Sequence, residues 1–325
     1  MNTIDIVGGS GFIGTRLVQR LTSNDTAKLN IIDKAPSSEY PDLVKHADVR
    51  SVEELRHSLS DGSVLINLAA EHRDDVRPLN LYDEVNVDGA RNLCEVARQK
   101  GINKIIFTSS VAVYGFAPLG TDETGSIAPF NDYGRTKYEA EEVFRAWQKE
   151  DSDARTLVII RPTVVFGEGN RGNVYNLIKQ VASKKFLMIG DGTNRKSMAY
   201  VENVAAFIEH ALDFSAGVHT YNYVDKPDFT MNELIKEIKK NLGRPATPGM
   251  RLPYALGLGI GHLLDGVAKI TGKKLPISSI RVKKFCADTC FNTSVTNTGF
   301  TPPVSLKDGL MATVTHEFKE SGDTQ

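Results

Sequence analysis

Residues 3–14 read Thr3-Ile4-Asp5-Ile6-Val7-Gly8-Gly9-Ser10-Gly11-Phe12-Ile13-Gly14, an apolar run that leads directly into a glycine-rich turn. In a turn with G-x-x-G-x-x-G spacing, the first glycine permits the tight bend and the second lets the backbone approach a pyrophosphate. The third lets the following helix pack closely on the strand. The free N–H groups and partial positive charge at the start of that helix favour phosphate. The stretch predicts a dinucleotide site that comprises Gly8, Ser10, Gly11, Phe12, Ile13 and Gly14.

Beyond the turn, short apolar runs alternate with longer amphipathic stretches. The expected strands are Thr3–Val7, Leu29–Ile32, Val64–Leu68, Lys104–Thr108 and Leu157–Ile160. The expected helices are Ile13–Leu21, Val52–Leu59, Val85–Gln99 and Tyr133–Lys149. Strands that are continuous in Val, Ile and Leu are buried on both faces, as in a parallel sheet covered by helices. The alternation predicts an α/β fold with a Rossmann-type, doubly wound parallel sheet.

The regular alternation ends near Gly167, where glycine and asparagine become frequent. Further helices are expected at Val174–Ala182, Val201–Leu212 and Met231–Asn241. We therefore predict a dinucleotide-binding Rossmann domain in residues 1–166 and a smaller C-terminal α/β substrate lobe in residues 167–325. Some strands of the second part are expected to return to the main sheet.

Composition limits the partners and the compartment. The formal net charge is −1, so no overall field attracts nucleic acid. Three cysteines, Cys94, Cys286 and Cys290, favour a reducing compartment over a disulfide framework, and we expect no metal site. Because we find neither a leader pattern nor a run of about 20 apolar residues, we expect a cytoplasmic enzyme. Residues Glu320–Gln325 have the composition of a polar tail.

Asp33 makes the choice of dinucleotide more specific. It ends the second expected strand, 19 residues after Gly14. A carboxylate at this point can accept hydrogen bonds from both ribose hydroxyls, and it repels a 2′-phosphate. This position favours NAD over NADP. Two readings stay open, because Asp33 could instead serve as a turn residue and the neighbouring Lys34 could tolerate NADP.

Three further side chains suggest acid–base chemistry. Tyr133 and Lys137 are four residues apart, so on a helix they share one face. An ammonium near a phenol lowers the phenol pKa, which lets tyrosine act as an acid or base. Ser110 follows the expected strand Lys104–Thr108, at the sheet edge where α/β folds bind ligands. Its hydroxyl could hydrogen-bond the reacting oxygen, although Ser109 or Ser110 could instead cap a turn.

Taken in order, these motifs resemble one family. The glycine turn, Asp33, Asp48-Val49, Leu68-Ala69-Ala70, Asn86, Ser110, Tyr133-x-x-x-Lys137 and Arg161-Pro162 are similar to the nucleotide-sugar epimerase/dehydratase group of extended short-chain dehydrogenase/reductases. The resemblance spans nearly the whole chain. It implies contacts with NAD by the glycine turn and by the following residues: Asp33, Asp48, Val49, Leu68, Ala69, Ala70, Asn86, Tyr133, Lys137 and Pro162.

Several reactions use this set of residues. Sugar 4,6-dehydratases of this group carry an Asp-Glu pair where this chain has Val111 and Ala112, so we do not expect dehydration. A 4-epimerase needs only Ser110, Tyr133, Lys137 and NAD, and it proceeds through a 4-keto sugar. An NAD(P)H-dependent 4-ketoreductase would use the same residues once per turnover. A non-catalytic dinucleotide-binding sensor is the remaining alternative.

The second half of the chain carries the expected substrate residues. Arg171–Asn176 resembles a segment that contacts the sugar diphosphate in this family, with Asn173 as the best candidate. Lys196 stands where relatives usually carry arginine, so Ser110, Tyr133, Asn173 and Lys196 form the expected substrate set. Lysine offers a point charge where arginine offers a bidentate fork, and Arg195 could substitute for it. The alternative reading of this region is a solvated loop.

Several unusual strings are similar to bacterial O-antigen 4-epimerases. They are Ala69–Val76, Arg171–Leu177, Lys196–Val201, Ile270–Lys274 and Arg281–Cys286. The similarity implies a substrate in surface polysaccharide (lipopolysaccharide) synthesis: an N-acetylhexosamine on UDP or on undecaprenyl diphosphate, exchanged between its gluco and galacto forms. It also implies a homodimer, for which Val85–Gln99 and Tyr133–Lys149 are the candidate helices.

One segment suggests a peripheral membrane contact. Residues 252–264 are apolar and rich in glycine, and lysines and arginines follow up to Lys284. An apolar helix with a basic flank can rest on an anionic membrane, here the inner face of the plasma membrane. The alternative is a helix packed on the lobe, followed by a solvated basic loop.

Overall fold

The computed structural model describes residues 3–24, 27–73, 76–247, 249–271 and 278–319. Sequence predictions that involve Asp74, Asp75, Gly272–Lys274 and Glu320–Gln325 lie outside these residues. The chain forms two compact units. Unit 1 comprises residues 1–165, 201–224 and 291–304, and unit 2 comprises residues 166–200, 225–290 and 305–325.

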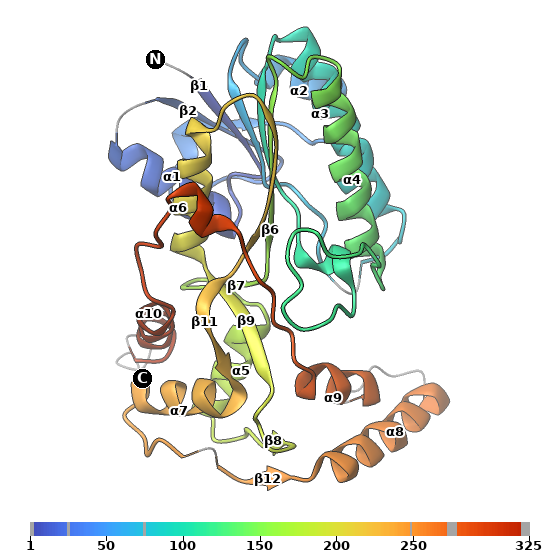
Figure 1. Ribbon diagram of the computed structural model, residues 1–325, viewed down its shortest axis with the longest axis vertical. Helices are drawn as coiled ribbons and strands as arrows, with labels where there is room; N and C mark the ends of the chain where they lie inside the picture. Colours follow the sequence, from blue (N-terminus) through green and yellow to red (C-terminus); the bar gives the residue numbers. More distant parts are fainter. Residues whose placement is uncertain (1–2, 25–26, 74–75, 248, 272–277, 320–325) are drawn as a thin grey trace. The chain divides into compact units, whose positions relative to one another are not determined.

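The core of unit 1 is a parallel sheet of seven strands (Figure 1). Its order is β10-β6-β5-β4-β1-β2-β3. The strands are β1 (Thr3–Val7), β2 (Lys28–Asp33), β3 (Val44–His46), β4 (Val64–Asn67), β5 (Lys104–Thr108), β6 (Thr156–Pro162) and β10 (Gly217–Tyr223). The chain starts in the middle and winds outward in both directions, so the topological switch point lies between β1 and β4. This arrangement confirms the predicted Rossmann-type α/β fold class.

Helices cover both faces of this sheet. In Figure 1, α1 (Phe12–Asn24) and α6 (Val201–His210) lie on one face. On the other face lie α2 (Val52–Ser58), α3 (Gly89–Gln99) and α4 (Asp132–Lys149). The short helices are η1 (Pro41–Leu43), η2 (Asp83–Asp88), η3 (Val111–Tyr114), η4 (Ala211–Asp213) and η5 (Val295–Thr298).

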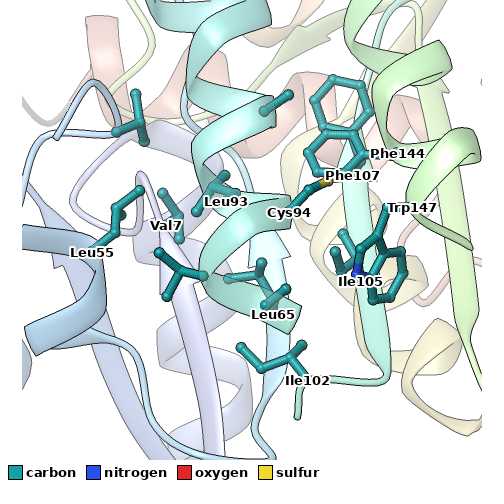
Figure 2. Packing of buried hydrophobic residues seen from close by; sticks show 14 of the residues in the cluster. Val7, Leu55, Leu65, Leu93, Cys94, Ile102, Ile105, Phe107, Phe144 and Trp147 are labelled. Carbon is teal, nitrogen blue, oxygen red and sulfur yellow. The ribbon is translucent and has the colours of Figure 1, made fainter. Parts of the chain in front are cut away.

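One large hydrophobic cluster of unit 1 lies between the sheet and α2, α3 and α4 (Figure 2). Leu55, Leu93 and Trp147 from these helices are fully buried. They belong to one cluster with Leu65 of β4 and Ile105 of β5. This burial on the helix side explains why the strands read as continuous apolar runs.

Unit 2 is a smaller α/β lobe. Its strands are β8 (Met188–Ile189), β9 (Arg195–Tyr200), β11 (Asp225–Thr230) and β12 (Arg251–Leu252), and β7 (Val164–Phe166) spans the passage from unit 1. Its helices are α5 (Asn173–Ala182), α7 (Met231–Asn241), α8 (Tyr254–Thr271), α9 (Ser279–Cys286) and α10 (Leu306–Phe318). Strands β9 and β11 pair antiparallel, and β8 and β12 pair parallel. The buried side chains of Ile178, Ile235 and Leu310 form part of its interior.

The chain passes between the units several times, which a single boundary after residue 166 does not describe. Residues 201–224 and 291–304 belong to unit 1. They supply α6, η5 and the edge strand β10, which pairs parallel to β6 over seven residues. Strand β10 is thus a strand of the second half that lies in the main sheet.

Candidate active site

The glycine turn joins β1 to α1 at the carboxyl edge of the sheet. Gly8 has a φ of +77°, and a Cβ added there would lie 2.6 Å from the backbone nitrogen of Ala69. A Cβ on Gly14 would lie 2.4 Å from the carbonyl oxygen of Gly9. A side chain at either position would therefore displace backbone, and glycine keeps the turn tight and α1 close. The cradle, with the unpaired N–H groups of the first turn of α1, fits a dinucleotide pyrophosphate.

Asp33 lies beside this turn. Its carboxylate accepts hydrogen bonds from the backbone N–H of Ser10 at 3.1 Å and of Ala35 at 2.9 Å. The hydroxyl of Ser10 donates to the carbonyl oxygen of Ala35 at 3.0 Å. These bonds fix the carboxylate next to the cradle. Asp33 is thus part of the turn, and the same placement fits the predicted contact with a ribose.

Asp48 and Val49 follow β3, where the resemblance implies a contact with adenine. The guanidinium of Arg50 donates to both carboxylate oxygens of Asp48, and this pairing lowers the Asp48 pKa. The carbonyl of buried Val49 accepts a hydrogen bond from Asn92 Nδ2 at 2.9 Å. A surface hollow of ≈ 480 Å³ lies beside Asp48 and Glu84. The adenine contact itself stays a prediction.

Asn86 braces the segment that follows β4. Its side chain is buried on η2, and its Oδ1 accepts from the backbone N–H of Glu71 at 2.8 Å. Its Nδ2 donates to the Glu71 carbonyl at 3.0 Å and to Thr136 Oγ1 at 2.9 Å. Asn86 therefore holds the end of the Leu68-Ala69-Ala70 segment to α4. Its predicted contact with the cofactor stays a prediction.

Ser110 and Tyr133 face each other at the same edge of the sheet. Ser110 follows β5, and its Oγ accepts from the backbone N–H of Ala112 at 3.1 Å, which caps η3. The Ser110 hydroxyl also lies close enough to the Tyr133 phenol to lower the pKa of that phenol. Tyr133 is held in the first turn of α4, which Asn131 caps by accepting from the Gly134 N–H at 2.9 Å. Ser110 thus both caps a turn and contacts the phenol.

Burial dominates the protonation of this site. It raises the pKa of Tyr133 to about 12, although the nearby Ser110 hydroxyl acts in the opposite direction. Lys137 is buried, and its Nζ donates to the Thr108 carbonyl at 2.7 Å. Burial lowers the Lys137 pKa to about 7. Desolvation is therefore the largest influence on the phenol pKa in the protein alone, and the lowering of that pKa by Lys137 stays a prediction.

A buried polar network behind Ser110 was not predicted from the sequence. Ser109 Oγ donates to Glu141 Oε1 at 2.5 Å, so the hydroxyl of Ser109 is engaged by this carboxylate. Glu141 is fully buried and accepts from Arg161 Nε at 2.8 Å. Arg161 in turn donates to the Tyr114 hydroxyl at 2.6 Å, and Tyr114 donates to Asn222 Oδ1 at 2.8 Å. The network ties α4 to β5, β6 and β10 directly beneath the candidate site.

The predicted cofactor residue Pro162 is buried at the end of β6, next to Arg161.

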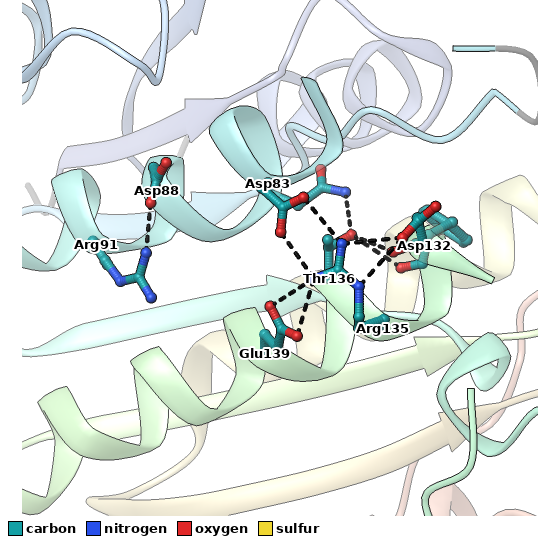
Figure 3. A network of polar contacts seen from close by, with 9 residues as sticks. Asp83, Asp88, Arg91, Asp132, Arg135, Thr136 and Glu139 are labelled. Carbon is teal, nitrogen blue, oxygen red and sulfur yellow. Dashed lines mark hydrogen bonds and ion pairs between the residues drawn. The ribbon is translucent and has the colours of Figure 1, made fainter. Parts of the chain in front are cut away.

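A second network lies on the surface of the first turn of α4 (Figure 3). Arg135 donates to both oxygens of Asp83 on η2, at 2.8 and 3.0 Å, and to Glu139 at 3.0 Å. These pairs join η2 to the turn that carries Tyr133. Because they are solvent-exposed, they contribute to orientation more than to stability.

The two candidate substrate residues of unit 2 have different surroundings. Asn173 is exposed at the start of α5. The Nζ of Lys196 donates to the carbonyls of Lys284 and Ala287 at 2.9 and 2.6 Å, so this ammonium caps the end of α9. A contact between Lys196 and a diphosphate would have to replace these bonds. Both substrate contacts stay predictions.

Comparisons with known proteins agree with this arrangement. The model of the NAD dependent epimerase/dehydratase family matches residues 4–223. The N-acetyl-alpha-D-glucosaminyl-diphospho-ditrans,octacis-undecaprenol 4-epimerase of Escherichia coli O157:H7 is 49% identical over 315 residues, which cover 96% of this chain and 94% of the relative. The UDP-glucose 4-epimerase of Vibrio cholerae is 29% identical, with coverage of 96% and 94%.

Solved structures support the fold independently. The UDP-glucuronic acid 4-epimerase from Bacillus cereus, in complex with NAD, superposes with a TM-score of 0.74 at 22% identity. The match covers 97% of this chain and 98% of that one. At this identity the likeness shows the shared fold.

Proposed function

Because the chain belongs to the NAD dependent epimerase/dehydratase family, we propose that it is a 4-epimerase that interconverts the gluco and galacto forms of an N-acetylhexosamine. The observation that carries the proposal is the placement of the Ser110 hydroxyl beside the Tyr133 phenol, at the sheet edge that also holds the glycine cradle. NAD is the cofactor.

The roles of the residues follow from their chemistry. Tyr133 removes the proton of the C4 hydroxyl, and Ser110 holds the same oxygen by a hydrogen bond. NAD, held by the glycine cradle and Asp33, would supply a reversible hydride acceptor for C4, and the positive charge of its nicotinamide would lower the pKa of a nearby phenol. Tyr133 then returns its proton to the oxygen of the 4-keto sugar. Lys137 anchors this end of α4 to the Thr108 carbonyl.

Two other reactions fit less well. Dehydration requires a second acid–base pair, and the side chains of Val111 and Ala112 on η3 cannot move a proton. A 4-ketoreductase would use Ser110 and Tyr133 once and would consume a reduced cofactor. The 49% identical relative is named a 4-epimerase, which favours the reaction that restores its cofactor.

The name of the same relative supports undecaprenyl diphosphate as the carrier of the sugar. The enzyme would then work at the inner face of the plasma membrane, as a peripheral protein that contacts it through residues 252–284. A UDP-linked sugar is the second candidate carrier, since the Vibrio cholerae relative is named for one. In both cases the product would serve the synthesis of a surface polysaccharide.

A homodimer through α3 and α4 is the assembly that we propose. The outer face of these helices is charged, and Arg98 of α3 pairs with Glu150 just after α4 at 2.6 Å. Such a face can form a polar contact between two copies, and a sedimentation experiment would measure the mass of the particle.

The proposal is tested by incubating the purified protein with N-acetylglucosaminyl-diphospho-undecaprenol and, separately, with UDP-N-acetylglucosamine, without added NADH. We expect the galacto epimer from one of them, and a Tyr133→Phe variant that retains NAD but loses about 10²- to 10⁴-fold in rate. Tyr138→Phe, on the same helix, is the matched control. Absence of the epimer from both substrates would overturn the proposal. Stoichiometric oxidation of NADH by a 4-keto sugar would indicate the reductase, and NAD binding without any turnover would indicate a sensor.

A further inference from the structure

Helix α8 packs against the rest of unit 2 with its smallest residues. Gly257 and Gly261 are its buried positions. A Cβ on Gly257 would lie 2.6 Å from Ile189 Cγ2 of β8, and a Cβ on Gly261 would lie 2.8 Å from Ser279 Cα of α9. The glycines therefore face protein and allow the close approach of α9, which lies alongside α8 in Figure 1.

Four large apolar side chains of α8 lie on its solvent side, whereas Leu258 and Leu264 are half-buried. The exposed fractions of these four are 54% for Leu256, 38% for Ile260, 68% for Leu263 and 40% for Val267. These positions follow an i, i+4, i+7, i+11 pattern, so the four side chains form one stripe, which we call the α8 face. A surface helix of a globular protein normally turns such a stripe toward the core. Here the polarity of the helix is reversed.

Charge is distributed unevenly around the α8 face. Residues 251–286 contain one acidic residue, Asp265, whose carboxylate accepts a hydrogen bond from the Ser279 N–H at 3.1 Å. The described basic residues of this segment are exposed: Arg251, Lys269, Arg281, Lys283 and Lys284. The whole chain has a net charge of only −1, so the segment that carries the apolar stripe is markedly more basic than the chain as a whole.

We propose that the α8 face docks on an anionic lipid bilayer, with α8 parallel to the surface. Its apolar stripe enters the boundary between headgroups and acyl chains, and the basic residues of α9 contact lipid phosphates. In the described part of the chain no helix is long and apolar enough to cross a bilayer, so α8 lies on the surface and does not span it. This inference rests on the proposed function, because the proposed lipid-linked sugar would be located at the same membrane surface.

Charge also argues against a second copy of this chain as the partner. In a symmetric dimer the same patch meets itself, so the basic side chains of both copies would come together. An anionic surface neutralises them instead. The apolar stripe and the basic residues therefore both favour an anionic lipid bilayer as the partner of the α8 face.

Sedimentation with lipid vesicles tests the proposal on the full-length protein without any sugar substrate. We expect binding to vesicles that contain phosphatidylglycerol, weaker binding to vesicles of phosphatidylcholine alone, and loss of binding at high salt. Leu263→Glu combined with Val267→Glu should weaken binding by about tenfold or more. Met311→Glu is the matched control, because Met311 is an apolar residue on α10 with 49% exposure.

The outcomes separate this proposal from the proposed function. Equal binding by the wild type and the double variant, or no binding at all, overturns docking and leaves the epimerase assay unaffected. Vesicle binding without turnover overturns the function alone. If the double variant turns a dimer into a monomer while vesicle binding is unchanged, the α8 face belongs to a second copy and the proposal fails.

Discussion

Single residues at the candidate site are held by partners that lie far from them in the sequence. Glu141 is the clearest case, because it binds the Ser109 hydroxyl and the Arg161 guanidinium within the core. Ser109 directly precedes Ser110, so the position of Glu141 sets where the Ser110 hydroxyl lies. We regard Glu141 as a positioning residue, since its carboxylate is engaged by Ser109 and Arg161.

Glu141→Gln should destabilise the protein by about 3–5 kcal/mol, because it leaves the buried Arg161 charge without its partner. The double variant Glu141→Gln/Arg161→Met should recover most of this loss, because both charges are then removed. Urea unfolding of the two variants and of Arg161→Met alone measures the coupling. Simple addition of the two single losses would contradict a paired role.

The sequence indicated Ser110, Tyr133 and Lys137 because each lies in a short, continuous motif. It did not indicate the Glu141–Arg161 pair, whose members are on α4 and β6 and meet only in the fold. One signal was available, since Glu141 follows Lys137 by four residues and so shares its helix face. The sequence could not predict the raised pKa of Tyr133, because the main influence on this pKa is burial, which depends on the folded structure.

At the level of elements, the apolar periodicity located β1, β5 and α7 with their exact bounds. It also predicted one helix over Val85–Gln99, where the structure has the π-helix η2 followed by α3. The widened turn carries Asn86, whose amide brackets the backbone of Glu71. Periodicity does not report such a bulge, because the apolar spacing on either side of it is nearly unchanged.

The glycine turn gives a prediction at the same scale. Gly14→Ala places a methyl group 2.4 Å from the Gly9 carbonyl oxygen, so α1 must move away from β1. We expect a loss of about 1–3 kcal/mol in stability and a clear loss of NAD affinity, measured by thermal unfolding and by titration. Gly259→Ala is the control: it lies in a helix with nothing within 4 Å, and it should stabilise the helix by up to about 1 kcal/mol. Unchanged NAD affinity in Gly14→Ala would contradict the role of close packing.

For the molecule as a whole, the first half of the sequence predicted a doubly wound parallel sheet, without the order of its strands and without β3. There, each strand is followed by a helix and pairs with a neighbour. In unit 2, β8 and β12 have only two residues each, and β9 and β11, with six each, carry many polar residues, so apolar periodicity does not reveal these strands. Asp5 shows another limit: this buried carboxylate in β1 is satisfied by Asn30, Ser60 and Ser63, which only the fold brings together.

Stability of the whole molecule should depend on pH through Lys137. Its pKa is lowered to about 7 in the folded protein, against an ordinary value of 10.5. Between these pH values the unfolded chain binds more protons than the folded one, so stability rises with pH, by up to about 1.4 kcal/mol per pH unit. Below pH 7 this contribution is constant.

Urea unfolding of the NAD-free protein between about pH 7 and 10 measures this rise. Lys137→Met should have a flatter profile than the wild type, and the exposed Lys149→Met on the same helix should not. Identical slopes for all three proteins would mean that Lys137 stays protonated, and hence better solvated, throughout this range.

The return of β10 to the main sheet has a consequence for anyone who dissects this protein. A fragment that stops at residue 166 looks complete by its motifs, yet it lacks the strand that covers β6. All seven residues of β6 are buried in the intact chain. Truncation would turn this interior strand into an edge strand whose backbone N–H and C=O groups are free to pair with another chain. Limited proteolysis or recombinant expression of that half should therefore yield aggregates, whatever its capacity to hold a dinucleotide.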